Sequence, residues 1–227
     1  MSEGVAVHGH EHHPDLQHQF STLRQQHEAA TLGMWVFLVT EVLFFGGLFT
    51  AYLLYRIAYP DAWAAASNQL NIVQGGVNTA VLIGSSLTMA MAVRAAQTGF
   101  RRATVNWLLG TMALGLVFLV IKGFEYHEKW VLGEVPGLNF TLTGPYAAQE
   151  EIFFSLYFSL TGLHALHMVI GFGLLATITW MAQRGRFSPR WYTPVELSGL
   201  YWHFVDIVWI FLFPLLYLVD RVGAVAH

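Results

Sequence analysis

The stretch YWHFVDIVWIFLF, residues 201–213, is almost entirely apolar and aromatic, yet it contains His203 and Asp206. It lies within a longer apolar segment, Leu197–Val219, which is long enough for a membrane-spanning helix of about 20 residues. Ionisable side chains in such helices are rare, because charge is costly in hydrocarbon, and they usually face a bundle interior or a cavity. His203 and Asp206 therefore indicate an interior face that needs polar partners.

The composition of the whole chain is that of a membrane protein. Of its 227 residues, 55% are hydrophobic and 11% are charged, and the mean hydropathy is +0.49. A soluble domain carries about 25% charged residues. The chain has no cysteine, which excludes disulfides, thiolate metal sites and iron–sulfur clusters within it. The formal net charge of −3 and the lack of a basic patch argue against a nucleic-acid partner.

Four further apolar stretches precede residues 197–219 and bring the expected number of spans to five. Polar or turn-forming links separate them, and none has the short alternating pattern of barrel strands. The sequence therefore predicts an all-α fold, a polytopic transmembrane helical bundle in one domain over residues 32–227. The expected spans are Gly33–Ile57, Val77–Ala96, Val105–Phe124, Ile152–Met181 and Leu197–Val219.

The basic residues of the links predict the orientation of the bundle, because cytoplasmic links carry an excess of Lys and Arg. With a cytoplasmic N-terminus, seven of these residues lie inside and four lie outside. We therefore expect the N-terminus in the cytoplasm and the C-terminus outside. The inside set is Arg24, Arg94, Arg101, Arg102, Arg184, Arg186 and Arg190, and the outside set is Arg56, Lys122, Lys129 and Arg221.

A polar, His-rich arm, residues 1–31, precedes the spans. Leu16, Phe20 and Leu23 are spaced i, i+4 and i+7, which predicts a short helix lying on the membrane surface or on a partner. Ahead of it, HGHEHH (residues 8–13) has the side chains to bind a divalent metal, but a solvated tail is the favoured interpretation.

Six acidic or histidine side chains within or next to the expected spans are candidate functional residues. From the residues alone, Glu41 has two interpretations of equal weight. It is either a functional site, which exchanges protons or positions lipid or a partner helix, or a hydrogen-bonded link between helices of this chain. Glu125 lies near the expected outer boundary. No catalytic residue is predicted. The six are Glu41, Glu125, His164, His167, His203 and Asp206.

The depths of these residues follow from a helical rise of about 1.5 Å per residue. Counted from the expected cytoplasmic ends, Glu41 is roughly 12 Å deep, and His203 and Asp206 are roughly 9 and 14 Å deep. The fourth span runs in the opposite direction, which puts His167 roughly 20 Å from the same face. We therefore expect Glu41 to share a layer with His203 and Asp206. His164 and His167 are expected nearer the outer face.

The histidines do not predict a haem or metal site. His164 and His167 are one turn apart on one helix face, so they cannot bind the two opposite faces of one haem. A three-histidine site that includes His203 requires similar depths, and the expected depths differ by about 10 Å. We therefore expect no metal and no cofactor bound by this chain.

Five segments of the chain, in order, resemble the cytochrome c oxidase subunit III family. GMWVFLVTEVLFFGGLFTAYLLYR (33–56) is similar to the glutamate-bearing helix of that family, and residues 201–213 are similar to its last helix. The matches cover about residues 30 to 220 and resemble the short bacterial form, which has five spans rather than seven. The remaining segments are NTAVLIGSSLTMAMA (78–92), KGFEYHEKW (122–130) and FFSLYFSLTGLHALHMVIG (153–171).

The resemblance implies a non-redox subunit of a proton-pumping haem–copper terminal oxidase of the aerobic respiratory chain, multi-pass in the bacterial plasma membrane. Haem and copper are expected in partner subunits. By the same resemblance the chain packs directly on subunit I, with subunit II and further respiratory subunits as other partners. It supports proton uptake and protects the oxygen-reducing site. Glu41 would match the family's buried carbodiimide-reactive carboxylate. Phospholipid is expected to bind, although the two absent helices form one wall of the family's lipid cleft.

Three alternatives stay open from the sequence. A quinol oxidase or a nitric oxide reductase-associated homologue would differ in the electron donor. A small proton channel or transporter would use Glu41 with Asp206, but five spans offer no even inverted repeat. A haem-bearing quinone-reactive anchor would need haem ligands that the histidines do not supply.

Overall fold

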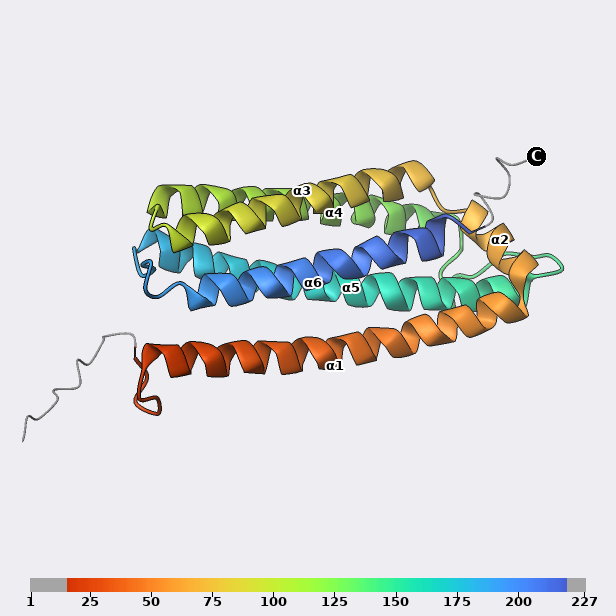
Figure 1. Cartoon of the computed structure of the whole chain (residues 1–227). Helices are drawn as coiled ribbons and strands as arrows, with labels where there is room; N and C mark the ends of the chain where they lie inside the picture. Colours follow the sequence, from red (N-terminus) through yellow and green to blue (C-terminus); the bar gives the residue numbers. More distant parts are fainter. Residues whose placement is uncertain (1–15, 220–227) are drawn as a thin grey trace, which may run out of the picture.

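The computed structural model describes residues 16–219, which form six helices (Figure 1). Five of them are long and apolar enough to cross a membrane, which confirms the all-α fold with five spans. The sixth, α2, is a short helix in the link after the first span and was not predicted. The helices are α1 (Leu23–Ala58), α2 (Pro60–Asn68), α3 (Ile72–Gln97), α4 (Arg101–Val131), α5 (Ala147–Gln183) and α6 (Thr193–Tyr217).

The helix ends are set by local capping chemistry. The Thr22 side chain accepts a hydrogen bond from the backbone N–H of Gln25 at the start of α1, and Asn71 does the same at the start of α3. Gly99 and Gly185 follow α3 and α5 with φ values of 77° and 70°, a conformation that glycine adopts without steric cost. These caps lie outside the apolar stretches, so the helices extend beyond the expected spans.

The start of α1 differs from the expected N-terminal arm. Residues 16–22 form a turn and bends, and the helix that begins at Leu23 continues without a break into the first span. A separate surface helix through Leu16 and Phe20 is therefore not formed, because the Thr22 cap begins the helix after both residues. The HGHEHH segment lies outside the described residues.

The long helices run side by side, and their packing is uneven (Figure 1). α3 packs along α4, α6 packs on both α3 and α5, and α4 also packs on α5. Within residues 16–219, α1 packs only on α2, α5 and α6. It buries a single seam of Leu38, Phe45 and Tyr52, spaced seven residues apart. α1 is therefore the outlying helix of the bundle.

The indole of Trp202 in α6 is fully buried in the core of the bundle. A Cβ atom at Gly115 of α4 would lie 2.9 Å from this ring, and one at Gly171 of α5 would lie 3.0 Å from it. Both distances are too short for a side chain, so the two glycines let α4 and α5 approach Trp202 closely. The indole N–H donates a hydrogen bond to Ser85 Oγ of α3 at 2.7 Å. One side chain thus joins three neighbouring helices to α6.

The start of α1 lies at the same end of the bundle as the α3–α4 and α5–α6 links (Figure 1). His27 Nδ1 of α1 lies 3.0 Å from Thr193 Oγ1 at the start of α6. The opposite end holds α2, the α4–α5 link and the end of α6. This alternation agrees with the predicted order of spans, and which end faces the cytoplasm stays a prediction.

Candidate functional site

A carboxyl–imidazole pair joins the outlying helix to the rest of the bundle. Glu41 Oε2 of α1 lies 3.0 Å from His167 Nε2 of α5. The side chains of Glu41 and His167 are 18% and 9% exposed, so the pair is mostly buried. Both residues lie near the middle of long apolar helices. The pair is therefore the polar link between α1 and α5 at mid-bundle.

The geometry of His167 fixes how many protons the pair holds. His167 Nδ1 lies 2.8 Å from the backbone oxygen of Leu163, and because a carbonyl can only accept, Nδ1 carries a proton and donates it. The second ring nitrogen faces Glu41, so one proton occupies the space between the two side chains. The pair is then either a neutral acid with a neutral imidazole or a carboxylate with an imidazolium. These two states differ only in where that proton sits.

Aromatic rings enclose the pair. The ring of Phe45 lies 5.4 Å from the His167 ring, and Tyr201 stacks on it at 6.5 Å. The Tyr201 hydroxyl donates to the backbone oxygen of His167 at 3.0 Å. Apolar surroundings lower the local dielectric constant and strengthen the hydrogen bond between carboxyl and imidazole.

The contact between Glu41 and His167 corrects the predicted layers. Glu41 lies 18 residues after Leu23, the true start of α1, and His167 lies 16 residues before Gln183, the true end of α5. Both are therefore roughly 25 Å from the same end of the bundle. The expected depths were wrong because they were counted from the ends of the apolar stretches, and α1 extends ten residues further on that side than expected.

His203 and Asp206 face α3 rather than Glu41. His203 Nδ1 lies 2.7 Å from Ser86 Oγ of α3, which ties α6 to α3. The same hydroxyl lies beside the buried carboxyl of Asp206. The expected common layer therefore does not bring these side chains together, because Glu41 pairs with His167 of α5 whereas His203 and Asp206 lie against Ser86 of α3.

His164 occupies a different environment from His167, although the two are one turn apart. Its ring is buried and lies 5.3 Å from both Phe118 and Trp209. Within residues 16–219, neither of its ring nitrogens has a hydrogen-bond partner. In the same part of the chain, no group of three or more His, Asp or Glu side chains has the geometry to hold a metal ion.

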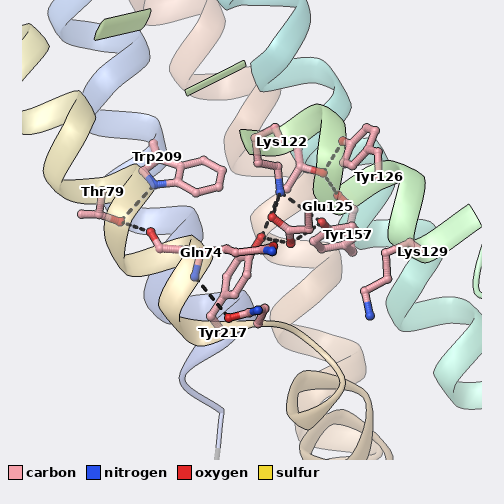
Figure 2. Close-up of polar contacts among 12 residues, drawn as sticks. Gln74, Thr79, Lys122, Glu125, Tyr126, Lys129, Tyr157, Trp209 and Tyr217 are labelled. Atoms are coloured by element: carbon pink, nitrogen blue, oxygen red, sulfur yellow. Dashed lines mark hydrogen bonds and ion pairs between the residues drawn. The ribbon is translucent and has the colours of Figure 1, made fainter. Parts of the chain in front are cut away.

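Glu125 belongs to a buried ionic network near the end of α4 (Figure 2). Lys122 Nζ lies 3.0 Å from Glu125 Oε2, 3.0 Å from the Tyr157 hydroxyl of α5 and 2.9 Å from the Tyr217 hydroxyl of α6. Both tyrosine hydroxyls also donate to Glu125 Oε1. The Lys122 and Glu125 side chains are 5% and 1% exposed. Each charge is therefore neutralised and fully hydrogen-bonded where three helices meet.

A second buried pair closes the same end of the bundle. Lys129 Nζ of α4 lies 2.6 Å from Glu134 Oε2 and donates to the backbone oxygen of Gln69 at 2.7 Å. The Gln69 amide in turn donates to Glu150 of α5 at 3.0 Å. The segment after α2 is thereby fixed over the ends of α4 and α5.

Sequence reasoning named Glu125 but missed its partners. The sequence places Lys122 and Lys129 in the charge count of an outer link. In the structure both belong to α4, and their side chains are buried in the bundle. A signal was present: Lys122 and Glu125 are opposite charges three residues apart, which lie on one helix face. Tyr157 and Tyr217 carried no such signal, because tyrosine is common at the ends of membrane spans whether or not it binds a charge.

Comparison with known proteins identifies the chain's relatives. The family model described as cytochrome c oxidase subunit III matches residues 18–220. Cytochrome c oxidase subunit 3 of Thermostichus vulcanus is 34% identical over 97% of this chain and 96% of its own length. The chain belongs to the cytochrome c oxidase subunit III family. This confirms the resemblance found in the sequence and places the chain in a haem–copper oxidase.

Further relatives extend the family match to other bacterial groups. Cytochrome c oxidase subunit 3 of Synechocystis is 36% identical over 93% of this chain and 79% of its own length. The probable cytochrome c oxidase subunit 3 of Mycobacterium leprae is 36% identical over 83% of this chain and 87% of its own length. The match to subunit III relatives therefore covers nearly all of the described bundle, including α1 with Glu41.

Proposed function

We propose that this chain is the non-redox subunit III of a proton-pumping cytochrome c oxidase, packed directly on subunit I in a bacterial plasma membrane. In this role it supports proton uptake and protects the oxygen-reducing site, while haem and copper reside in subunits I and II. The observation that carries the proposal is the Glu41–His167 pair, which holds one proton between two side chains at mid-bundle.

The pair is suited to storing and returning a proton rather than to breaking bonds. Movement of the proton between Nε2 and Oε2 interconverts a neutral pair and an ion pair without changing the net charge of the site. The pair is not sealed, since 18% of the Glu41 side chain is exposed and, within residues 16–219, α1 packs only on α2, α5 and α6. A proton can therefore enter or leave at Glu41 when a partner subunit or ordered water contacts it.

The outward face of α1 supports a partner on that side. Within residues 16–219 this helix buries only three side chains, and it exposes large apolar ones next to Glu41, such as Val42 and Leu43. In the membrane this face is covered by subunit I or by phospholipid, whose acyl chains match it in polarity. The phospholipid expected from the family resemblance thus has an apolar helix face to occupy.

The buried lysines support the proposed orientation. Of the four basic residues counted as outside, Lys122 and Lys129 lie within α4 and are buried. They are therefore not residues of the exposed link, and the basic residues of the links are more strongly biased toward the end that holds Arg101, Arg102 and Arg184 than the sequence count suggested. A larger bias favours this end in the cytoplasm, together with the N-terminus.

Cytochrome c is favoured over quinol as the electron donor by the names of the relatives, which are cytochrome c oxidase subunits. A proton channel formed by this chain with Asp206 is disfavoured by the structure, since Asp206 faces Ser86 on α3 while Glu41 pairs with His167. The two acids of that alternative therefore lie against different helices, α3 and α5.

The test is a Glu41→Gln variant in the intact oxidase complex, purified in a mild detergent. We expect the complex to assemble with a normal initial rate of oxygen consumption. The number of turnovers before inactivation should fall by roughly tenfold, less than the 10²–10⁴ that a group acting directly in acid–base catalysis contributes. Glu28→Gln, an exposed acid on the same helix, is the matched control and should behave as wild type.

Two results would contradict the proposal. One is a Glu41→Gln complex whose turnover lifetime and proton uptake equal those of the wild type. The other is purification of this chain alone as a stable homo-oligomer, without a haem-bearing subunit. In that case proton flux through the chain in liposomes, abolished by Glu41→Gln, would favour the channel alternative.

A further inference from the structure

A depression of about 440 Å³ lies where α4 begins and α5 ends, remote from the Glu41–His167 pair. α1 does not pack on α4 within residues 16–219, so this depression lies on another side of the bundle from the α1 face. Two arginines, two amide side chains and one valine line it. They are Arg101, Arg102, Val105, Asn106 and Gln183.

The positive charge of this depression is not neutralised by the chain. Within residues 16–219, neither Arg101 nor Arg102 forms an ion pair, and the first turn of α4 has no acidic residue. Phe100, at the N-cap, makes no side-chain hydrogen bond to the helix start. The partial positive charge of the helix terminus therefore adds to that of the two guanidinium groups. Together they favour an anion with several acceptor oxygens, which arginine binds in a bidentate manner.

Other depressions of the molecule hold less unpaired positive charge. The one at the end of α1 contains Arg56 but also Asp61. The one at the start of α1 contains Arg24, whose Nε donates to Glu28 Oε1 at 2.8 Å, and Arg190, so only one of its arginines has no ion pair within residues 16–219. The depression at the start of α4 is therefore distinguished by two arginines without an acidic partner among the described residues.

An apolar surface continues from the charged depression along the same helices. Leu109 and Leu116 of α4 are exposed, and so is Trp180 near the end of α5. The Arg184 guanidinium lies 4.0 Å from the centre of the Trp180 ring, a cation–π contact. Exposed Trp beside Arg is typical of the membrane–water interface, where headgroups lie above acyl chains. A free phosphate ion would bind to the arginines but would make no contact with this apolar surface.

We propose that this depression binds the phosphate headgroup of an anionic phospholipid. Arg101 and Arg102 bind the phosphate oxygens, Asn106 and Gln183 donate to the remaining headgroup oxygens, and one acyl chain lies along Leu109 and Leu116. The site is independent of the proposed function of the Glu41–His167 pair, because it shares no residue with it.

The experiment uses the whole oxidase complex in nanodiscs of phosphatidylcholine with about 10% phosphatidylglycerol. Native mass spectrometry then counts the phosphatidylglycerol molecules retained after release. An interfacial arginine contributes about a fivefold gain in affinity for an anionic lipid, so the double variant Arg101→Gln with Arg102→Gln should lower the affinity for one retained lipid by roughly 25-fold.

The single variant Arg102→Gln should lower this affinity by about fivefold. It keeps Arg101, which packs against Gly185, so it tests the site without disturbing the α5–α6 link. Arg56→Gln is the control and should change nothing.

The outcomes separate a lipid from a free anion. Loss of one retained phosphatidylglycerol in the arginine variants, with no change in nanodiscs of phosphatidylcholine alone, supports the proposal. Equal retention in wild type and both variants overturns it. Displacement of the lipid by 10 mM inorganic phosphate also overturns it, because the site would then be a phosphate site without a lipid requirement. The retained lipid is counted without reference to turnover lifetime, so a failure at this site is distinguishable from a failure at Glu41.

Discussion

Two of the acid–base pairs in the bundle have opposite designs. The Glu41–His167 pair has one direct contact between its side chains and joins a loosely packed outer helix to α5. The Lys122–Glu125 pair is inside a core of three helices, and two tyrosine hydroxyls complete its hydrogen bonds. The first is partly accessible and has few partners, whereas the second is inaccessible and saturated.

This difference separates a site that can change its state from one that cannot. A saturated network loses several hydrogen bonds when any proton moves, so its groups are held in one state and serve to join helices. A pair that shares a single proton has two states of equal net charge. Few other hydrogen bonds are lost when the proton moves from one side chain to the other. We therefore propose proton exchange for the pair at mid-bundle and a structural role for the network near the end of α4.

The largest effect on stability is expected at the saturated network. Replacing Glu125 by Gln leaves the Lys122 ammonium buried without its counter-charge, which should lower the free energy of unfolding by about 3–5 kcal/mol. Thermal unfolding and assembly yield of the complex measure this. In the control, Lys122→Met with Glu125→Leu removes both charges and should recover most of the loss. A single variant as stable as wild type would show that the network is not structural.

A smaller effect is expected when one tyrosine hydroxyl is removed from each region. Tyr217→Phe removes hydrogen bonds to both charges of the network and should cost about 1.5–3 kcal/mol. Tyr201→Phe removes one bond to a backbone oxygen beside the pair and should cost about 0.5–1.5 kcal/mol. The midpoint of thermal unfolding measures both. Equal losses in the two variants would remove the distinction between the regions.

The smallest effect on stability is expected at the pair itself. In Glu41→Gln the amide N–H can still donate to His167 Nε2, so the free energy of unfolding should change by less than about 1 kcal/mol. This variant should alter turnover lifetime while leaving the melting midpoint nearly unchanged. If it instead destabilised the complex as much as Glu125→Gln, the pair would be a structural link like the network.

The sequence was sufficient for the five spans and the interior positions, but not for the pairing of those positions. Apolar length and polar links identify spans without knowledge of neighbours, which is why α1, α3, α4, α5 and α6 were all predicted. The partner of Glu41 depends on the true start of α1, and a capping residue, Thr22, determines that start ten residues ahead of the apolar stretch. Burial of Lys122 depends on helix packing, which hydropathy does not encode.

The His203 and Asp206 side chains illustrate the same limit. Their place within a span follows from residues 201–213, but the choice between α1 and α3 as their partner depends on which face of α6 each helix covers. Trp202 determines that face, since its ring fits against Gly115 and Gly171. The two glycines have no distinctive pattern in the sequence.

The spacing of Glu41 and His167 along the chain has a consequence for biosynthesis. The two residues are 126 positions apart, and α1 enters the membrane long before α5 is translated. At roughly 5–20 residues per second, the ribosome needs about 6–25 s to reach the histidine. During that interval the first helix holds Glu41 without its partner His167. Contact of α1 with α5 and α6 therefore waits for the second half of the protein, whereas its contact with α2 does not.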